Sequence, residues 1–355
     1  MDIDEMNKKT ICFDLEGPLS PQDNAYEVMK LIGAEGASIF EVISRYDDII
    51  SLDEREGYEP GDTLALIVPF FLLHDITEYD IARVSARAKI VKGAEYLFKR
   101  LHAEDWDIYI ISTSYAQHAY NIGNKLGVPE DHIICTNCSF DFEKKKKALA
   151  KKYLHTVKKA EEDILALTLY SEIESDNTEQ ERIVKRLDDF FFQQLPALGF
   201  DIFTTRVMGG ERKAEAIRAI VQEKDIALHD LIVVGDSITD YKMLKEVATH
   251  GGVAVVFNGN EYAIPYANVG LASADIRSLY LVCDAFERGG KRKVMDVVRN
   301  WEDDQRDLED DPANMNLSIS YFHNLEDADQ RRREEIIKIH KQFRMQVRED
   351  AGKLG

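Results

Sequence analysis

The stretch TICFDLEGPL, residues 10–19, begins like a buried strand and ends on two carboxylates, Asp14 and Glu16. Its first residues are β-branched, apolar or aromatic, which is typical of a strand covered on both faces. Gly17 and Pro18 then interrupt this pattern. Because a carboxylate adds nothing to an apolar core, we expect both acidic side chains to serve chemistry at the end of this strand.

Four more short runs have the same continuous apolar character, which predicts strands of a parallel sheet with helices on both faces. They are residues 107–112, 132–136, 230–235 and 253–257. Helical patterns lie before and after the second strand, at 94–103 and at 116–126, and the latter stops at Gly127. This alternation predicts an α/β fold with a doubly wound parallel sheet.

The spacing of the expected strands is uneven, which indicates insertions. Roughly ninety residues separate the first strand from the second, far more than one crossover helix needs. We therefore expect a helical cap after the first strand, a second helical insertion and a C-terminal helical extension. The expected catalytic core comprises residues 1–18, 91–138 and 206–278, the cap 19–90, the second insertion 139–205 and the extension 279–355.

The C-terminal extension contains a helical pattern with one apolar face. Four residues recur on this face at helical spacing, namely Ile336, Ile339, Phe343 and Val347. We expect the face to pack onto its own domain. The alternative is that it contacts a second copy of the chain or a protein partner.

Charge and composition exclude several classes of function. The chain has 355 residues and a formal net charge of −20, so it repels nucleic-acid backbones and anionic membrane surfaces. Its longest apolar run, residues 64–73, contains Pro69 and is about half as long as a membrane-spanning helix. We expect a cytoplasmic protein, because the N-terminal residues do not resemble a secretory signal and four cysteines are too few for a disulfide framework.

Chemically active side chains stand where the expected strands end or where a helix begins. They are Asp14 and Glu16 after the first strand, Ser112 and Thr113 after the second, Lys213 in GGERKAEAI, and Asp236 and Asp240 in GDSITD. Each alone has an ordinary reading as a helix cap, a turn residue or a solvated charge. Because ligands of parallel sheets bind beyond the carboxyl ends of the strands, we expect these side chains to meet.

The order of these pieces resembles that of a known family. Strand plus D-x-E-G, strand plus Ser/Thr, a lysine at a helix start and strand plus G-D-x-x-x-D resemble the haloacid dehalogenase (HAD) superfamily of phosphohydrolases. The segments FDLEGPLSP, VKGAEYLFKRL and GDSITDYKML are most similar to its phosphoserine phosphatase-like branch. The resemblance implies a HAD-like Rossmannoid core and a Mg²⁺-dependent phosphatase that acts on a small phosphorylated metabolite through an aspartyl-phosphate intermediate.

The resemblance also implies a role for each catalytic side chain. Asp14 would attack the phosphorus atom, while Glu16 would protonate the leaving oxygen and later take a proton from the attacking water. Lys213 would hold a positive charge beside the phosphoryl oxygens, which Ser112 and Thr113 would also bind.

The resemblance further implies a Mg²⁺ site of hard oxygen ligands, which would offset the repulsion between Asp14 and the phosphate. Its expected members are Asp14, the main-chain carbonyl of Glu16, Asp236 and Asp240. Asp240 would orient a metal-bound water or pair with Lys213.

Two residues depart from the usual motif of the family. Glu16 stands where Asp is more common and adds about 1.5 Å of reach. Pro18 stands where Thr is usual and removes a hydroxyl and an N–H. These departures make phosphoryl transfer to an acceptor other than water an alternative to hydrolysis.

In the cap, four side chains are candidates for binding a substrate carboxylate, although a surface role is the simpler reading. They are Arg45, Arg55, His74 and Arg83.

Two other kinds of function fit the sequence. One is a catalytically weak scaffold or regulatory subunit, docked into a larger assembly through the acidic stretch 302–311 and the C-terminal helix. The other is a dehalogenase or phosphonate hydrolase, although a second acid at position 16 fits phosphate esters better. We favour the phosphatase with a small-molecule phosphate ester as its substrate.

Overall fold

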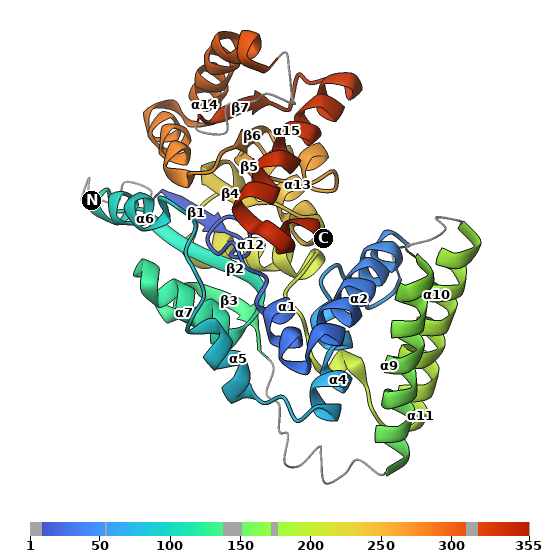
Figure 1. Cartoon of the computed structure of the whole chain (residues 1–355). Coiled ribbons are helices and arrows are strands. Elements are labelled where there is room, and N and C mark those ends of the chain that lie inside the picture. Colours follow the sequence, from blue (N-terminus) through green and yellow to red (C-terminus); the bar gives the residue numbers. More distant parts are fainter. Residues whose placement is uncertain (1–8, 54, 138–150, 172–176, 310–318, 355) are drawn as a thin grey trace.

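The computed structural model describes residues 9–53, 55–137, 151–171, 177–309 and 319–354. Its centre is a seven-stranded sheet with the strand order β3-β2-β1-β4-β5-β6-β7 (Figure 1). All neighbouring strands are parallel except β6 and β7, which are antiparallel. The expected α/β fold with a mostly parallel sheet is confirmed.

Five strands lie where the sequence predicts them, within a few residues, and two were not predicted. The five are β1 (Thr10–Phe13), β2 (Asp107–Tyr115), β3 (Ile133–Thr136), β4 (Leu231–Gly235) and β5 (Val253–Phe257). The two additional strands are β6 (Val269–Ala272) and β7 (Tyr321–Asn324). Both are short, β6 contains a glycine and β7 ends in two polar residues, so neither has the long apolar run that marks a buried strand.

Side chains alternate along β1, an interior strand of the sheet, so that β1 contributes to two cores. Ile11 and Phe13 belong to the core that also contains residues of α6, α7 and α14, whereas Cys12 belongs to the core of α12, α13 and α15. These helices are α6 (Ala94–Ala103), α7 (Ala116–Leu126), α12 (Glu211–Lys224), α13 (Tyr241–Thr249), α14 (Tyr280–Glu309, interrupted at Gly289 and Gly290) and α15 (Gln330–Arg348). Helices therefore cover both faces of the sheet, as its apolar strands require.

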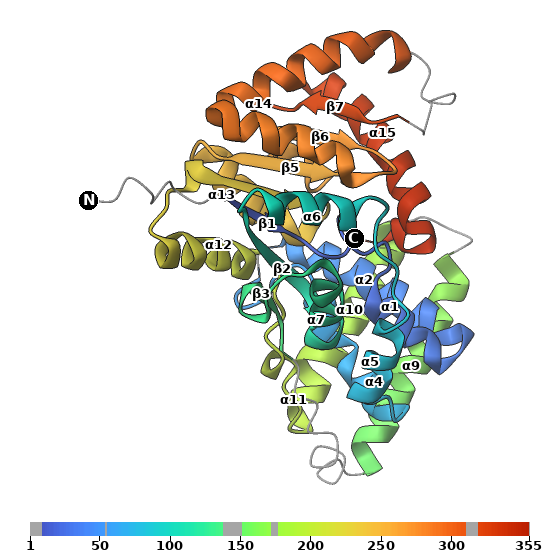
Figure 2. The same ribbon diagram turned by 90° about the vertical axis from the view of Figure 1, so that its left-hand side faces the viewer.

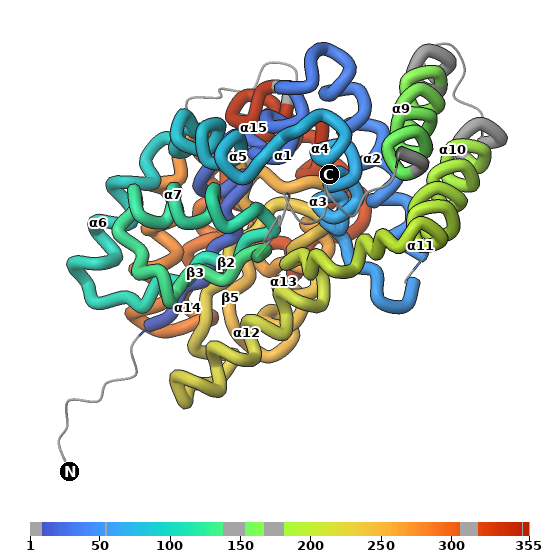
Figure 3. The backbone as a smooth tube through the Cα atoms, turned by 90° about the horizontal axis from the view of Figure 1, so that it is seen from below, coloured from blue at the N-terminus to red at the C-terminus, as the bar shows by residue number. Residues whose placement is uncertain are grey.

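A third core lies in a helical cap. The cap helices that follow β1 are α1 (Asn24–Met29), α2 (Ala34–Leu52), α3 (Thr63–Leu66), α4 (Val68–Leu73) and α5 (Glu78–Ser85). The second insertion supplies α9 (Lys151–Ser171), α10 (Asn177–Asp189) and α11 (Leu195–Ala197). Figure 3 shows α9 and α10 beside α2, and residues of both insertions share one core. The two insertions thus form a single helical layer.

The C-terminal extension is not only helical, because β7 extends the sheet. α14 and α15 lie beside β6 and β7 (Figure 2). Ile336, Ile339 and Phe343 are buried and Val347 packs against the core, so the apolar face of α15 is covered by its own domain. Within the described ranges, no helix combines the length and apolar character that a membrane-spanning segment requires.

Candidate active site

The site is built around Asp14, the residue that follows β1. Its backbone N–H donates a hydrogen bond to the carbonyl oxygen of Val234 on β4 at 2.8 Å. Phe13 and Val234 are partners in the parallel register, so β1 and β4 end at the same edge of the sheet. Asp236, which follows β4, therefore emerges next to Asp14, as expected for the carboxyl ends of parallel strands.

Lys213 is the cation that faces Asp14. It lies in the first turn of α12, and its ammonium group donates to Asp14 Oδ1 at 2.5 Å and to Asp240 Oδ1 at 2.7 Å. Burial alone would lower the pKa of Lys213, but the two carboxylates outweigh burial and raise the pKa above its usual value. Lys213 is therefore charged and held between two aspartates.

Two glycines before Lys213 allow the cap to approach the core. A Cβ at Gly209 would lie 1.9 Å from the backbone oxygen of Pro60, and a Cβ at Gly210 would lie 2.1 Å from a carboxylate oxygen of Glu59. Gly210 also has a φ of 53°, which side-chain-bearing residues rarely adopt. The start of α12 therefore packs directly against the cap, and this position places Lys213 in the site.

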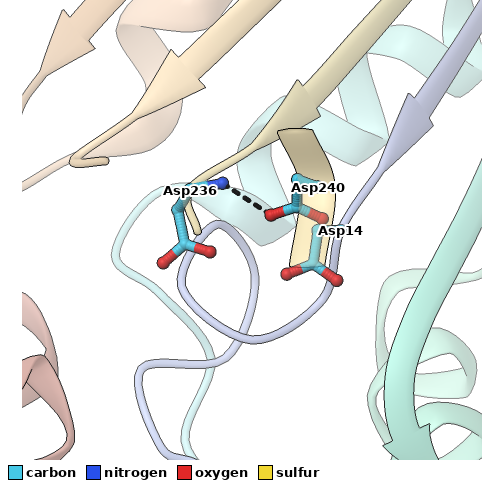
Figure 4. Close-up of side chains that lie close together, drawn as sticks. All are labelled: Asp14, Asp236 and Asp240. Atoms are coloured by element: carbon cyan, nitrogen blue, oxygen red, sulfur yellow. Dashed lines mark hydrogen bonds between the residues drawn. The ribbon is translucent and has the colours of Figure 1, made fainter. Parts of the chain in front are cut away.

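Asp240 organises the turn that follows β4. Its Oδ2 accepts hydrogen bonds from the backbone N–H groups of Asp236 at 2.9 Å and Ser237 at 3.1 Å (Figure 4). Its Oδ1 accepts from Lys213. Because both oxygens of Asp240 are engaged, the residue holds the turn and Lys213 in position rather than presenting a free ligand oxygen.

Asp14, Asp236 and Asp240 form an acidic group that suits a divalent cation. One ligand oxygen from each lies within 4.8 Å of the others (Figure 4). Asp236 Oδ1 is buried without a hydrogen-bond partner among the described residues, which is costly unless a cation or water binds it. At Gly17 a Cβ would lie 2.2 Å from Asp236 Oδ2, so glycine leaves the space that this carboxylate occupies. Asp14 and Asp236 therefore fit as ligands of the expected Mg²⁺ site, while Asp240 adds negative charge and holds Lys213 and the turn beside them.

The surroundings of Glu16 favour the protonated form of its carboxyl group. Its Oε1 accepts a hydrogen bond from the backbone N–H of Asn24 at 2.8 Å, and His118 Nε2 lies 3.8 Å away. Burial, followed by the charge of Asp23, raises the pKa of Glu16 to about 8. Glu16 thus holds a proton near neutral pH, as a donor to a leaving group must.

A cavity of about 70 Å³ lies between these groups and the cap. Asp14, Glu16 and Thr113 line it from the core, and Asp47 and Asp48 line it from α2. Thr113 Oγ1 is buried without a hydrogen-bond partner within the described part of the chain. The cavity is therefore closed by acidic cap residues on one side and lined by the expected catalytic groups on the other.

The two expected hydroxyl donors differ in position. Thr113 lines the cavity, whereas Ser112 is not among the lining residues. The Ser112 hydroxyl accepts a hydrogen bond from the backbone N–H of Ser114 at 3.1 Å, within the last part of β2, where the register with β3 shifts. Thr113 is thus better placed than Ser112 to contact a ligand.

The chain is similar to known hydrolases in sequence and in fold. The family model of the haloacid dehalogenase-like hydrolases matches residues 87–280, which is more than half of the chain. The chain belongs to this family. The expected membership of a hydrolase family is therefore confirmed. A search of curated proteins found no match. Asp14 precedes the matched span, and its contact with Lys213 joins it to the matched part of this HAD-like hydrolase.

Solved structures share the fold of this HAD-like hydrolase. The structure of gene product AF1437 from Archaeoglobus fulgidus is 28% identical in sequence, with a TM-score of 0.77 over 98% of this chain and 99% of that chain. A phospho-aspartyl intermediate analogue of phosphoserine phosphatase is 16% identical, with a TM-score of 0.50 over 77% of this chain and 98% of that chain. A substrate-bound phosphoserine phosphatase complex is 15% identical, with a TM-score of 0.50 over 78% and 98%.

The candidate carboxylate-binding residues of the cap do not line the cavity of this HAD-like hydrolase. Arg55 pairs with Asp188 at 2.6 Å, His74 with Glu161 at 2.8 Å and Arg83 with Asp80 at 3.1 Å, while Arg45 is exposed. The simpler reading, in which these side chains stabilise the cap or lie on its surface, agrees with these contacts.

Two further residues of the site, Arg344 and Arg348 of α15, were not predicted from the sequence. Both guanidinium groups form ion pairs with Asp236 Oδ2, and the Arg348 pair measures 2.9 Å. Their spacing of four places them on one helix face beside the apolar residues Phe343 and Val347. Two arginines next to an apolar stripe were therefore a signal, but only the fold shows that they reach Asp236, which is 108 positions from Arg344 and 112 from Arg348.

Proposed function

We propose that this HAD-like hydrolase is a Mg²⁺-dependent phosphatase that acts on a small phosphate ester through a phosphorylated Asp14. The observation that carries the proposal is the contact of Asp14 with Lys213 beside Asp236 Oδ1, which has no hydrogen-bond partner among the described residues. Transfer of a phosphoryl group to aspartate requires a carboxylate nucleophile, a fixed cation and an oxygen that can bind a metal ion. The site brings these groups together at one edge of the sheet.

In the first step, an Asp14 oxygen attacks phosphorus and the bond to the ester oxygen breaks. Glu16 gives its proton to that oxygen, so the product leaves as an alcohol. In the second step, a water molecule attacks phosphorus, Glu16 takes a proton from it, and the bond to Asp14 breaks. Inorganic phosphate leaves, and both side chains return to their starting forms.

Charge control of the nucleophile supports these steps. Burial, followed by the charge of Asp240, raises the pKa of Asp14 to about 7, and Lys213 acts in the opposite direction. A divalent cation bound by Asp14 and Asp236 would supply further positive charge at the reacting phosphate. With that cation bound, the pKa of Asp14 would fall and its carboxylate would be ionised and able to attack.

The cavity supports a small ester as the substrate. Its volume of about 70 Å³ and its cover of cap residues leave room for a phosphoryl group rather than for a macromolecule. An alcohol in place of water in the second step would make the same site a phosphotransferase, which is the alternative that Glu16 and Pro18 leave open.

The test is hydrolysis of p-nitrophenyl phosphate by the full chain with Mg²⁺. We expect turnover that chelation abolishes and that Asp14→Asn lowers by about a thousandfold or more, because the nucleophile is lost. Asp53→Asn, which changes an exposed cap aspartate, is the charge-matched control and should keep wild-type activity. Equal turnover by the wild type and Asp14→Asn would support a catalytically weak scaffold instead.

A further inference from the structure

Two guanidinium groups from the C-terminal helix lie in the site beside the expected nucleophile. Arg344 and Arg348 line the same cavity as Asp14 and Thr113. Their side chains are 3% and 6% exposed, although arginine is rarely buried without a strong reason. Figures 1 and 2 show the C-terminal end of the chain close to the cap helices, where Leu354 also lines the cavity.

The two arginines have different hydrogen-bond environments. Arg344 donates to the carbonyl oxygens of Gly352 at 3.2 Å and Leu354 at 2.8 Å besides its pair with Asp236, so it fastens the C-terminal turn. Arg348 forms its ion pair with Asp236, and its Nε is buried without a hydrogen-bond partner among the described residues. An unused donor of a buried guanidinium group is costly and is available to an anionic ligand.

We propose that Arg348 is an anion-binding residue of the active site that holds the phosphoryl oxygens of the substrate, and that Arg344 positions it. This inference rests on the proposed phosphatase function. It assigns part of the phosphate-binding site to the C-terminal extension, which lies outside the motifs of the core and of the cap.

The charge of the site supports this assignment. Asp14, Asp236 and Asp240 carry three negative charges, Lys213 carries one positive charge, and a divalent cation would make this set neutral. A phosphate monoester arrives as a dianion, which a neutral set does not balance. The guanidinium groups of Arg344 and Arg348 add two positive charges at the cavity wall, which offset the two negative charges of the substrate within this set of groups. Burial raises the pKa of Asp47 to about 7 and that of Asp48 to about 8, which limits the negative charge of the cap side of the cavity near neutral pH.

Asp236 is able to serve the cation and the arginines together. Its Oδ2 accepts from both guanidinium groups, while its Oδ1 has no hydrogen-bond partner among the described residues. One carboxylate therefore links the expected cation site to the arginine pair. Arg348 need not leave for a cation to bind, and its Nε, which has no partner in the described part of the chain, can donate to a phosphoryl oxygen, for which guanidinium is a strong donor.

The experiment measures binding of inorganic phosphate and of Mg²⁺ to the full chain by calorimetry, together with kcat and KM for p-nitrophenyl phosphate. The variants are Arg348→Gln, Arg348→Lys and, as a control on the same helix, Arg331→Gln, whose side chain is 88% exposed. We expect Arg348→Gln to weaken phosphate binding and raise KM by about tenfold to a hundredfold, because a charge-assisted hydrogen bond is lost. Arg348→Lys should recover part of the loss, and Arg331→Gln should match the wild type.

Binding of Mg²⁺ separates ligand recognition from a purely structural role. If Arg348 only fastened α15, its loss would disturb Asp236 and weaken Mg²⁺ binding along with phosphate binding. The proposal predicts that Arg348→Gln binds Mg²⁺ at least as tightly as the wild type, because a nearby positive charge that repels Mg²⁺ has been removed. Weakened Mg²⁺ binding, or phosphate binding as tight as in the wild type, would overturn it.

The proposed function is tested separately from this inference. A wild-type chain that neither binds phosphate nor hydrolyses the ester contradicts the phosphatase itself. A wild-type chain that does both, beside an Arg348→Gln variant that is unchanged, contradicts only the role of Arg348.

Discussion

Lys213 is the residue on which the charge balance of the site depends. Its ammonium group is buried between Asp14 and Asp240, and it contacts both. A buried ion pair adds little net stability compared with an apolar pair, but removal of one partner leaves an uncompensated charge. Here the loss of Lys213 would leave two adjacent carboxylates without their cation.

We therefore expect Lys213→Met to lower the free energy of unfolding by about 3–5 kcal/mol in the presence of a chelator, and to abolish phosphatase activity. A divalent cation should restore part of the stability, because it replaces the missing positive charge. Urea unfolding with and without Mg²⁺ measures the loss of stability and its recovery, and hydrolysis of p-nitrophenyl phosphate measures the loss of activity.

The matched control is Lys224→Met on the same helix. Lys224 forms a partly exposed ion pair with Asp107 at 3.3 Å, and such pairs contribute about 0–1 kcal/mol. A Lys213→Met variant as stable as Lys224→Met and still active would show that Lys213 has no role in the charge balance.

Helix α15 is the element that completes the site, and its docking depends on a buried histidine. His340 Nδ1 accepts a hydrogen bond from the backbone N–H of Gly259, and His340 Nε2 lies 3.3 Å from Nδ1 of His323 on β7. Gly270 of β6 packs against the same ring, because a Cβ there would lie 2.9 Å from His340 Nε2. Burial, followed by the proximity of His323, lowers the pKa of His340 well below its ordinary value of 6.5.

Acidification should therefore destabilise the folded chain through α15. Below about pH 6.5 the unfolded chain takes up a proton at His340 that the folded chain does not, so the free energy of unfolding falls by roughly 1.4 kcal/mol per pH unit from this group. Above that pH His340 is neutral in both states and contributes no pH dependence.

The measurement is the free energy of urea unfolding at about pH 7.5 and about pH 5.5 for the wild type and for His340→Asn. The asparagine oxygen retains an acceptor for Gly259 but does not titrate in this range. We expect the loss on acidification to be smaller in the variant by roughly 1.4 kcal/mol. Equal losses in the two proteins would show that His340 is not kept neutral by the fold.

The elements differ in how well the sequence predicts them. α6 and α7 match the predicted helices at both ends, because their apolar spacing and flanking residues are regular. β6 and β7 were missed, because four-residue strands with a glycine or with polar side chains lack a local signal. The pairing of β7 with β6 is a property of the sheet and not of either segment alone.

In the whole molecule, three segments far apart in sequence close one cavity. The core supplies Asp14, the cap supplies Asp47 and α15 supplies Arg348, while Lys213 contacts Asp14 from behind the cavity wall. The motifs of the core could be predicted because each follows a strand or begins a helix, and the topology of a parallel sheet brings such ends together. The contribution of α15 could not be predicted, because it depends on how the C-terminal extension folds back over the sheet.

The central claim is that Asp14 becomes phosphorylated, and a trapped intermediate tests it most directly. In Glu16→Gln the second step slows, because no base activates water, whereas p-nitrophenolate still leaves as a stable anion without a proton. The variant is incubated with p-nitrophenyl phosphate and Mg²⁺, and the reaction is quenched in acid. The protein is then digested, and the masses of the peptides are measured by mass spectrometry. We predict one phosphoryl group on the peptide that contains Asp14. A phosphoryl group on another peptide, or none while the wild type turns over, would contradict the account.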